Sequence, residues 1–423
     1  MPATPTFPHI RQQIAGVAVA DIVADVGTPV YVYDAAKIVE RIEDLAAFDV
    51  VRFAQKACSN LAVLDLCRRH GTLVDAVSGW EIRRALAAGY PDHGQPPPIV
   101  YTADIFDRES LDLVIQHQLH VNCGSPDMID QLGDHLSGGE ISLRVNPGFG
   151  HGHSQKTNTG GAQSKHGIWY EELSDCIERA AARGMAVTGL HMHIGSGTDL
   201  QHLSRVCDAM EQMARHVGST LVSISAGGGL PVPYKEGEAY VDLDAYFQLW
   251  DATRKRLESG LEHGLRLEIE PGRYLTAESG YLISEIRAIK RMGGNLFYLL
   301  DAGFNDLARP ILYGAYHPMS LAPADGSQDR PMQAVVVGGP LCESGDIFTQ
   351  EEGGFVSSRT LPKAEVGDYL VIGGAGAYGA VMASNYNSKP LAPEVLITHG
   401  ATHVIRRRQT FEELIAAERI LPE

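Results

Sequence analysis

The sequence predicts an α/β protein, in which a (β/α)8 TIM barrel is joined to a discontinuous, mostly antiparallel C-terminal β domain. Before residue 275, eight apolar runs of β type each end in a polar or glycine-rich cluster, with helical patterns between most of them. After residue 280 the pattern changes to strands that alternate with glycine-rich turns. Eight strand–helix units that close on themselves form a TIM barrel, and its functional groups lie at the carboxyl ends of the strands.

Each predicted barrel strand ends in a segment that carries polar residues or glycine. These segments are FAQKA (53–57), VDAVSG (74–79), IVYTAD (99–104), HVNCGS (120–125), LRVNPG (143–148), LHMHIGSG (190–197), ISAGGG (224–229) and LEIEPGR (267–273). The clearest helical patterns between them cover residues 61–70, 81–89, 171–184, 202–217 and 243–259.

One further strand is predicted near the N-terminus. The segment TPVYVYD (28–34) has the apolar pattern of a strand, and a helix at about 36–48 leads from it into the first barrel strand. We expect this early strand to join the late strands, which makes the β domain discontinuous. The predicted boundaries are therefore 36–280 for the barrel, and 1–35 together with 281–423 for the β domain.

Composition excludes several classes of function. The chain has 423 residues and a formal net charge of −17, which argues against a nucleic-acid or anionic-membrane partner. The short basic run 406–408 does not outweigh that balance, and we interpret it as a solvated strand edge. Six cysteines without CxxC spacing predict neither a zinc site nor a disulfide framework. No signal-peptide core or membrane-spanning run is present, so a cytoplasmic location is expected.

The first chemical group of interest is Lys56, which stands where an apolar strand ends. A lysine at the carboxyl end of a barrel strand can form an imine with an aldehyde cofactor. The alternative is a lysine whose aliphatic stem covers the strand end while its ammonium reaches water. Taken alone, Lys56 favours this alternative, and the neighbouring motifs reverse the preference.

Two further strand ends carry groups that suit a phosphorylated pyridine. Gly227, Gly228 and Gly229 follow a strand, and glycines let backbone N–H groups close around a phosphate. Glu270, followed by the Gly272–Arg273 segment, offers a carboxylate that can keep a pyridine nitrogen protonated. The alternatives are an ordinary turn for the glycines and a solvated ion pair for the second segment.

The HMHIGSG segment adds a ring and a hydroxyl. His193 could stack on a flat cofactor, and Ser196 with Gly195 could donate hydrogen bonds to a phosphate. We interpret His191 and His193 as a poor pair of metal ligands. We therefore predict no metal site.

Six motifs in this order resemble those of the pyridoxal-phosphate-dependent diaminopimelate decarboxylases: FAQKACSN, HMHIGSG, AGGGL, EPGR, CESGD and GAYG…SNYNS. That family belongs to a barrel-plus-β-domain class that also contains ornithine and arginine decarboxylases and alanine racemase. The resemblance covers roughly residues 25 to 415. It implies conversion of meso-2,6-diaminopimelate to L-lysine and carbon dioxide, the last step of lysine biosynthesis.

The resemblance also implies a role for each site residue. Lys56 would bind pyridoxal 5'-phosphate covalently, His193 would stack on its ring and Glu270 would meet its nitrogen. The residues expected around the phosphate are Ser196, Gly227, Gly228, Gly229, Gly272, Arg273 and Tyr378. Cys342 would protonate the carbon that loses carbon dioxide. The CESGD motif would enter the site from a partner subunit, so a homodimer with shared active sites is expected.

Substrate selection depends on the far end of diaminopimelate, which carries both a carboxylate and an ammonium. A guanidinium from Arg309 or Arg273 and the hydroxyl of Tyr313 suit the carboxylate, and Glu343 suits the ammonium. Tyr378 is expected to contact the substrate as well. The alternatives are a surface salt bridge at these residues, a relative that acts on ornithine, arginine or carboxynorspermidine, and a non-catalytic homologue that binds the cofactor.

Three remaining features complete the expectations. The long polar loop 146–167 is interpreted as a lid rather than a metal site, although it contains His151, His153 and His166. Trp80 stands where similar enzymes carry a small residue, which would alter packing behind the cofactor ring. Gly374 stands where an aspartate is common.

Overall fold

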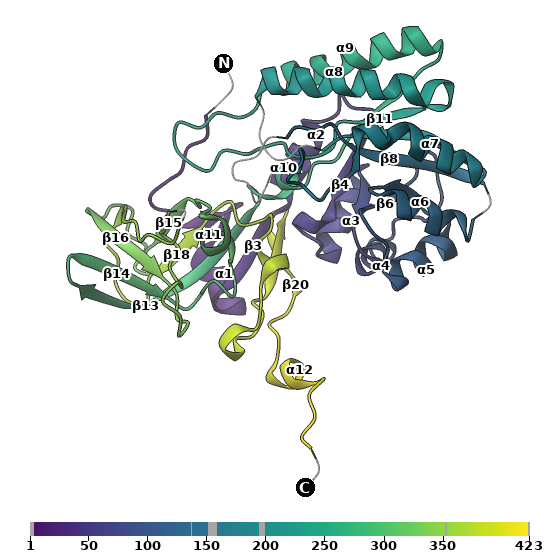
Figure 1. Ribbon diagram of the computed structural model, residues 1–423. Coiled ribbons are helices and arrows are strands. Elements are labelled where there is room, and N and C mark those ends of the chain that lie inside the picture. The colour runs from purple at the N-terminus through teal and green to yellow at the C-terminus, as the bar shows by residue number, and fades with distance from the viewer. Residues whose placement is uncertain (1–3, 137, 151–158, 194–198, 352, 422–423) are drawn as a thin grey trace.

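The computed structural model describes residues 4–136, 138–150, 159–193, 199–351 and 353–421 (Figure 1). Eight parallel strands form a closed barrel in the order β4-β5-β6-β7-β8-β10-β11-β12, with β12 returning to β4. The strands are β4 (Val50–Ala54), β5 (Leu73–Ala76), β6 (Ile99–Ala103), β7 (His120–Cys123), β8 (Gly139–Asn146), β10 (Met185–His191), β11 (Ser223–Ser225) and β12 (Arg266–Ile269). The predicted barrel is confirmed, and each strand precedes one of the expected polar segments.

Helices cover the outside of the barrel. They are α3 (Leu61–Arg69), α4 (Gly79–Ala87), α5 (Arg108–His117), α6 (Pro126–Gly133), α7 (Leu173–Ala182), α8 (Leu200–Val217) and α9 (Leu243–Leu261). Side-chain caps fix where several of them begin: Asn60 accepts from the N–H of Ala62, and Ser78 accepts from that of Glu81. The five expected helices are present, shifted by up to two residues at their ends. The helices α5 and α6 had no predicted bounds.

A second sheet of mostly antiparallel strands lies beside the barrel, at the left of Figure 1. Its main path runs β17-β16-β14-β13-β3-β19-β20, and β18 pairs with β13 and β15. The strands are β3 (Val30–Asp34), β13 (Gly280–Met292), β14 (Asn295–Leu300), β15 (Met319–Ala322), β16 (Met332–Gly338), β17 (Arg359–Pro362), β18 (Tyr369–Ile372), β19 (Glu394–Thr398) and β20 (Ala401–Arg406).

The early strand β3 lies inside this late sheet, as predicted. Tyr33 pairs with Gly280 of β13 in antiparallel register, and Tyr31 pairs with Glu394 of β19 in parallel register. In Figure 1 this purple strand therefore lies among green and yellow ones. The helix α2 (Ala35–Glu43) then leads toward the barrel, five residues shorter than the predicted 36–48 at its C-terminal end. A small hairpin, β1 (Gln13–Ile14) with β2 (Val17–Ala18), and α1 (Val19–Val26) precede β3 and were not predicted.

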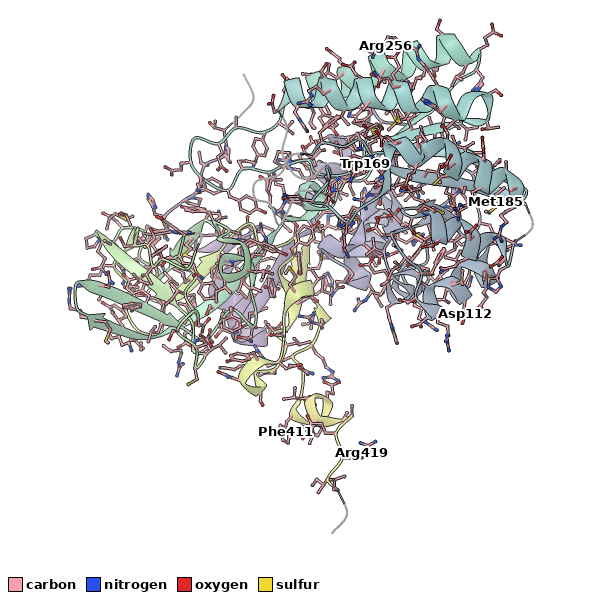
Figure 2. All side chains as sticks on the ribbon, in the orientation of Figure 1. Asp112, Trp169, Met185, Arg256, Phe411 and Arg419 are labelled. Atoms are coloured by element: carbon pink, nitrogen blue, oxygen red, sulfur yellow. The ribbon has the colours of Figure 1, made fainter. Side chains whose placement is uncertain are left out.

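The basic run near the C-terminus is mostly structural, so its interpretation as a solvated edge was wrong for two of the three arginines. Arg406 forms a 3.0 Å ion pair with Glu394, and Arg408 donates to the carbonyl oxygens of Thr28 and Pro29 at 3.1 and 3.0 Å. Arg407 is exposed. Beyond this run, α12 (Phe411–Ile415) and the following residues extend away from both sheets, as Phe411 and Arg419 show in Figure 2.

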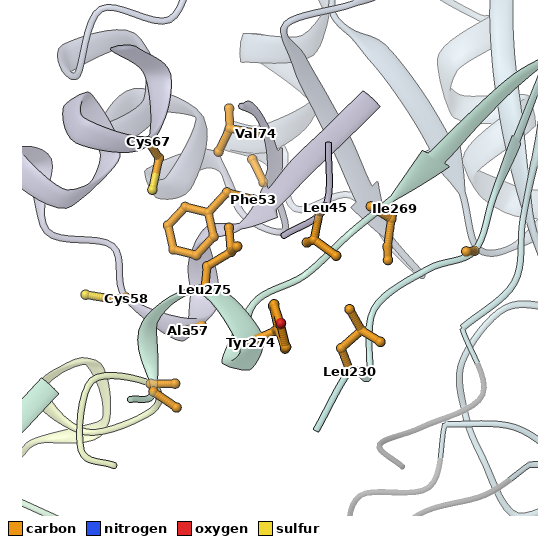
Figure 3. Close-up of a cluster of buried hydrophobic side chains, with 14 of the residues drawn as sticks. Leu45, Phe53, Ala57, Cys58, Cys67, Val74, Leu230, Ile269, Tyr274 and Leu275 are labelled. Atoms are coloured by element: carbon orange, nitrogen blue, oxygen red, sulfur yellow. The ribbon is translucent and has the colours of Figure 1, made fainter. Parts of the chain in front are cut away.

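A buried apolar cluster supports the end of β4 (Figure 3). Phe53 and Ala57 are fully or almost fully buried, and they flank the position of Lys56. Cys67, Val74 and Leu275 belong to the same cluster. Closely packed side chains leave little room for rearrangement, so the backbone that carries Lys56 is held in place.

No helix in the described part of the chain is long and apolar enough to cross a lipid bilayer. All six cysteines are unpaired; Cys342 is exposed and the other five are buried.

Candidate active site

Lys56 lies just beyond β4, in the short 3-10 turn η1 (Gln55–Ala57). Gln55 and Ala57, on either side of the lysine, are buried, whereas the Lys56 side chain is exposed. The apolar strand pattern therefore predicts the burial of its neighbours and not that of Lys56. The turn is closed by a 3.0 Å hydrogen bond from the Cys58 N–H to the Gln55 carbonyl. The amine therefore stands on a rigid base at the carboxyl end of a barrel strand.

Two carboxyl groups lie close enough to Lys56 to feel its charge. Burial raises the pKa of Asp75, the nearby Glu270 charge raises it further, and the Lys56 ammonium opposes both. Burial also raises the pKa of Glu81, to about 7, although Val77 donates its N–H to this carboxylate at 2.9 Å. Both acids come from the strand β5 or the start of α4, next to η1.

The raised pKa of Glu81 predicts a pH-dependent stability. The folded state prefers the protonated acid, so the free energy of unfolding falls as pH rises from 4.5, the unperturbed pKa, to about 7 and then levels off. Glu81→Gln stays neutral and still accepts from Val77. We expect chemical unfolding to show a gain for this variant that grows to about 1–3 kcal/mol by pH 8. An equal difference at every pH would contradict the prediction.

Glu270 is held as an ionised carboxylate one residue beyond β12. His191 Nε2 lies 2.6 Å from Oε2, and the Ser225 hydroxyl donates to Oε1 at 3.1 Å. Burial alone would raise the pKa of Glu270, but the attraction of His191 outweighs burial and lowers it below its usual value. Because the carboxylate is ionised, it accepts and His191 donates. The sequence predicted no metal-binding role for His191. Its ring instead donates a hydrogen bond to Glu270.

The glycine turn after β11 packs directly against these strand ends. A Cβ at Gly227 would lie 2.4 Å from the Met192 carbonyl oxygen, and one at Gly228 would lie 2.6 Å from that of Glu270. Gly227 and Gly229 also adopt φ values of +64° and +99°, which glycine tolerates best. Glycine is therefore required here by packing and by backbone conformation.

His193 lies against this turn. The Gly228 N–H donates to its Nδ1 at 3.0 Å, and burial lowers the pKa of the ring well below its usual value. The ring is therefore neutral, with Nδ1 as its acceptor. Ser196, expected beside His193, lies outside the described residues.

Arg273 and Tyr378 meet at the Lys56 turn. A Cβ at Gly272 would lie 3.2 Å from both the carbonyl oxygen of Ala54 and the Cβ of Ala57, and the Tyr378 N–H donates to the Ala57 carbonyl at 2.8 Å. The Arg273 guanidinium lies 5.3 Å from the centre of the Tyr378 ring. Residues from the second sheet thus reach the carboxyl end of the barrel.

Arg309 is buried at the first position of α11 (Arg309–Tyr313), and Tyr313 is half-buried at the last. The Arg309 Nη1 donates to His317 Nε2 at 2.9 Å. Burial lowers the pKa of His317 well below its usual value, and its Nδ1 faces the Gly373 carbonyl at 3.0 Å. The ring is neutral, so Nδ1 donates and Nε2 accepts. This arrangement fixes the direction of the Arg309 guanidinium.

Cys342 and Glu343 are exposed in a loop between β16 and β17. The Asp346 carboxylate accepts from the N–H groups of Leu341 and Phe304, each at 2.8 Å, which ties this loop to the segment before α11. Among the described residues, neither Cys342 nor Glu343 makes a hydrogen bond or ion pair with the barrel. A single chain therefore does not bring them to Lys56 through such contacts.

The expected lid is described only in part, because residues 151–158, with His151 and His153, lie outside the described residues. At its end, His166 Nδ1 and the Gly167 N–H approach Asp104 at 2.6 and 2.9 Å. His166 is thus paired with a carboxylate. No group of three or more His, Cys, Asp or Glu residues within the described ranges could hold a metal ion.

The sequence suggested that Trp80 alters the packing behind the cofactor ring. The structure does not agree, because Trp80 lies on the surface. Its side chain is 69% exposed and lies 5.8 Å from the Arg83 guanidinium.

The chain is similar to known pyridoxal-dependent decarboxylases. Residues 35–277 match the family model described as "Pyridoxal-dependent decarboxylase, pyridoxal binding domain". The diaminopimelate decarboxylase of Escherichia coli K12 is 55% identical over 93% of this chain and 94% of that protein. The chain belongs to the diaminopimelate decarboxylase family. The enzyme of that name from Streptomyces coelicolor is 51% identical over 99% of this chain and 95% of its own length.

Solved structures of diaminopimelate decarboxylases have the same fold. One crystal structure has a TM-score of 0.93 and 52% identity, and covers 98% of this chain and 99% of its own. The enzyme from Helicobacter pylori complexed with L-lysine has a TM-score of 0.82 and 30% identity, over 94% of this chain and 98% of its own. As a member of this family, the chain is a pyridoxal-phosphate-dependent carboxy-lyase. The comparisons favour diaminopimelate over the alternative substrates and over a non-catalytic homologue.

Proposed function

We propose that the residues around Lys56 convert meso-2,6-diaminopimelate to L-lysine and carbon dioxide. The observation that carries the proposal is the convergence of four strand ends. The Lys56 turn, the Glu270–His191–Ser225 network and the glycine turn all lie at the carboxyl face of one barrel. Carbon dioxide release, measured across meso-diaminopimelate, ornithine, arginine and carboxynorspermidine, tests it, and release from meso-diaminopimelate alone is expected.

These residues fit pyridoxal 5'-phosphate. Glu270 is ionised and so can hold the proton on the pyridine nitrogen, and the neutral His193 ring offers a flat face for stacking. Glycine at 227 and 228 leaves this turn without side chains that would fill a phosphate site, and the N–H groups of these two residues hold the turn against Ser225 and His193. When bound, the cofactor supplies an electron sink for the pair left behind by the departing carboxylate.

Each site residue would then have a defined task. Lys56 would hold the cofactor through its aldehyde carbon. Glu270, oriented by His191 and Ser225, holds the pyridine nitrogen in its protonated form. Cys342 delivers a proton to the carbon that has lost its carboxylate. The phosphate is assigned to Ser196, the 227–229 turn, Gly272, Arg273 and Tyr378.

Substrate selection is assigned to loops of the β domain together with Arg273 of the barrel. Arg309, fixed by His317, binds the distal carboxylate together with Tyr313 and Arg273, and Tyr378 lines the same space. Glu343 binds the distal ammonium. Ornithine and its relatives lack the distal carboxylate, so the buried Arg309 would stay unpaired with them.

Arg309→Ala is expected to lower kcat/KM for meso-diaminopimelate by about 30- to 1,000-fold. The reason is that the substrate carboxylate would enter a partly desolvated site without its charge-assisted partner. Steady-state carbon dioxide release measures the effect, and Arg83→Ala, which changes an arginine exposed beside Trp80, is the control. Wild-type efficiency in Arg309→Ala would show that another group reads the carboxylate.

We further propose that the protein acts as a homodimer in which Cys342 and Glu343 complete the partner's site. Their exposure and the lack of polar contacts with the described barrel of their own chain support this. The barrel is assigned to residues 36–280 and the β domain to 1–35 and 281–423, which the family match over 35–277 supports. We place the enzyme in the cytoplasm, in keeping with its six unpaired cysteines.

A further inference from the structure

Tyr234 joins the two arginines that the proposed substrate site uses. It lies on the loop after β11, and its hydroxyl oxygen accepts from Arg273 Nη1 at 3.0 Å and from Arg309 Nη1 at 3.4 Å. The Arg309 guanidinium also lies 5.3 Å from the centre of the Tyr234 ring, and the His317 ring meets it edge-on at 5.6 Å. One phenol thus holds two cations from different parts of the chain.

Gly374 makes room for this phenol. A Cβ at Gly374 would lie 2.8 Å from Tyr234 Cε1, closer than side-chain atoms pack, and its φ of +65° favours glycine as well. Similar enzymes commonly carry an aspartate at position 374. In this chain the glycine and the tyrosine form a matched pair.

The hydroxyl proton of Tyr234 remains available to a ligand. The oxygen accepts from two guanidiniums, so its O–H has to point away from both, and it donates to no acceptor among the described residues. Burial raises the pKa of Tyr234, but the two arginines outweigh burial and lower it, which strengthens the hydroxyl as a donor. An anion placed between the two cations would accept this proton.

We propose that Tyr234 is a specificity-determining residue that reads the distal carboxylate of the substrate, by orienting Arg273 and Arg309 and donating its own proton to the carboxylate. This inference rests on the proposed substrate site. It adds a contact from the barrel side, next to Arg273, to a carboxylate that Arg309 and Tyr313 of the β domain also bind. The proposal also predicts that Tyr234 does not affect the binding of ligands that lack this carboxylate.

Tyr234→Phe tests the proposal, because it keeps the ring on Arg309 and His317 and removes the hydroxyl alone. We expect KM for meso-diaminopimelate to rise about 10- to 100-fold with kcat nearly unchanged. The dissociation constant of L-lysine, which keeps the distal carboxylate, should rise by the same factor in calorimetric titration of the holoenzyme. Inhibition by 1,5-diaminopentane, which lacks that carboxylate, should not change.

Two further variants test whether an effect of Tyr234→Phe comes from the hydroxyl group. Gly374→Ala should displace the Tyr234 ring and weaken L-lysine binding without touching the hydroxyl itself. Tyr240→Phe is the matched control, because Tyr240 lies on the same loop but bonds to Glu278 and should leave L-lysine binding unchanged. Thermal unfolding of each variant reports any general loss of structure.

Distinct outcomes separate this inference from the substrate site on which it rests. If Arg309→Ala weakens L-lysine binding and Tyr234→Phe does not, the substrate site stands and the role of Tyr234 is overturned. If neither variant weakens L-lysine binding, both assignments fail. If Tyr234→Phe weakens binding of pyridoxal phosphate to the apoenzyme and not binding of L-lysine to the holoenzyme, Tyr234 serves the cofactor through Arg273, and the proposal is wrong.

Discussion

Lys56→Ala is expected to lower kcat for carbon dioxide release by at least about 1,000-fold, the largest loss anticipated for any single substitution in this chain. The variant loses the one amine on the rigid η1 turn and keeps the packing beneath it, because Phe53 and Ala57 supply that packing and the Lys56 side chain is exposed. Lys37→Ala is the matched control, since Lys37 pairs with Glu40 on α2. Near-wild-type turnover in Lys56→Ala would remove Lys56 from the mechanism.

Borohydride reduction of the holoenzyme locates the covalent attachment directly. In the untreated chain, trypsin cleaves after Lys56 and yields the peptides 53–56 and 57–68. Reduction of a cofactor bound to Lys56 blocks that cleavage, so a single peptide 53–68 that carries the added mass is expected. A modified peptide that contains any other lysine would refute the assignment.

Mixing two inactive variants is expected to restore about one quarter of wild-type activity. If Lys56 of one subunit works with Cys342 of the other, a mixed dimer of Lys56→Ala and Cys342→Ala has one site with both changes and one with neither. About half of the dimers are mixed after full exchange at equal amounts, which gives the expected fraction. The physical basis is that Cys342 is exposed on a loop that Asp346 ties to the second sheet.

Subunit exchange has to be measured independently, for example with differently tagged chains. If exchange is complete and the mixture stays as inactive as its parents, Lys56 and Cys342 act within one chain. The mixture of Lys56→Ala with Lys56→Arg is a suitable control, because no pairing of these subunits can rebuild a complete site.

Much of this architecture could be predicted because strand ends in a parallel barrel follow local sequence rules. The alternation of apolar strands and helical patterns specified all eight barrel strands, and it placed Lys56 and Glu270 just beyond β4 and β12. The early strand β3 was predicted to join the late sheet, and its pairing with β13 and β19 confirms it.

Other parts of the site depend on contacts that sequence spacing does not encode. Tyr234 lies in an irregular loop, and its partner Gly374 is far away along the chain, so no periodicity connects them. The pairing of His191 with Glu270 joins two strands across the barrel interior. His191 and His193 are two residues apart, so an extended chain directs both side chains to one face, but this spacing could not tell which group each ring contacts.

The basic run 406–408 shows a different limit. Composition indicated a solvated edge, yet Arg408 donates to the carbonyl oxygens of Thr28 and Pro29 in the backbone before β3. Carbonyl groups that are shielded from water need donors, and a distant arginine supplies them to these two partly buried residues. The number of charges along the sequence does not show which backbone carbonyl groups need a hydrogen-bond donor.

The position of β3 has a consequence for how the protein is made. The ribosome makes this strand before any strand of the barrel, but both of its neighbours, β13 and β19, are made only after the whole barrel. During translation its unpaired edges therefore have to be kept from pairing with other chains, until the final strands emerge and enclose it. A nascent chain that stops before β19 leaves β3 with one open edge, so truncation near the C-terminus endangers the first strand of the sheet as much as the last.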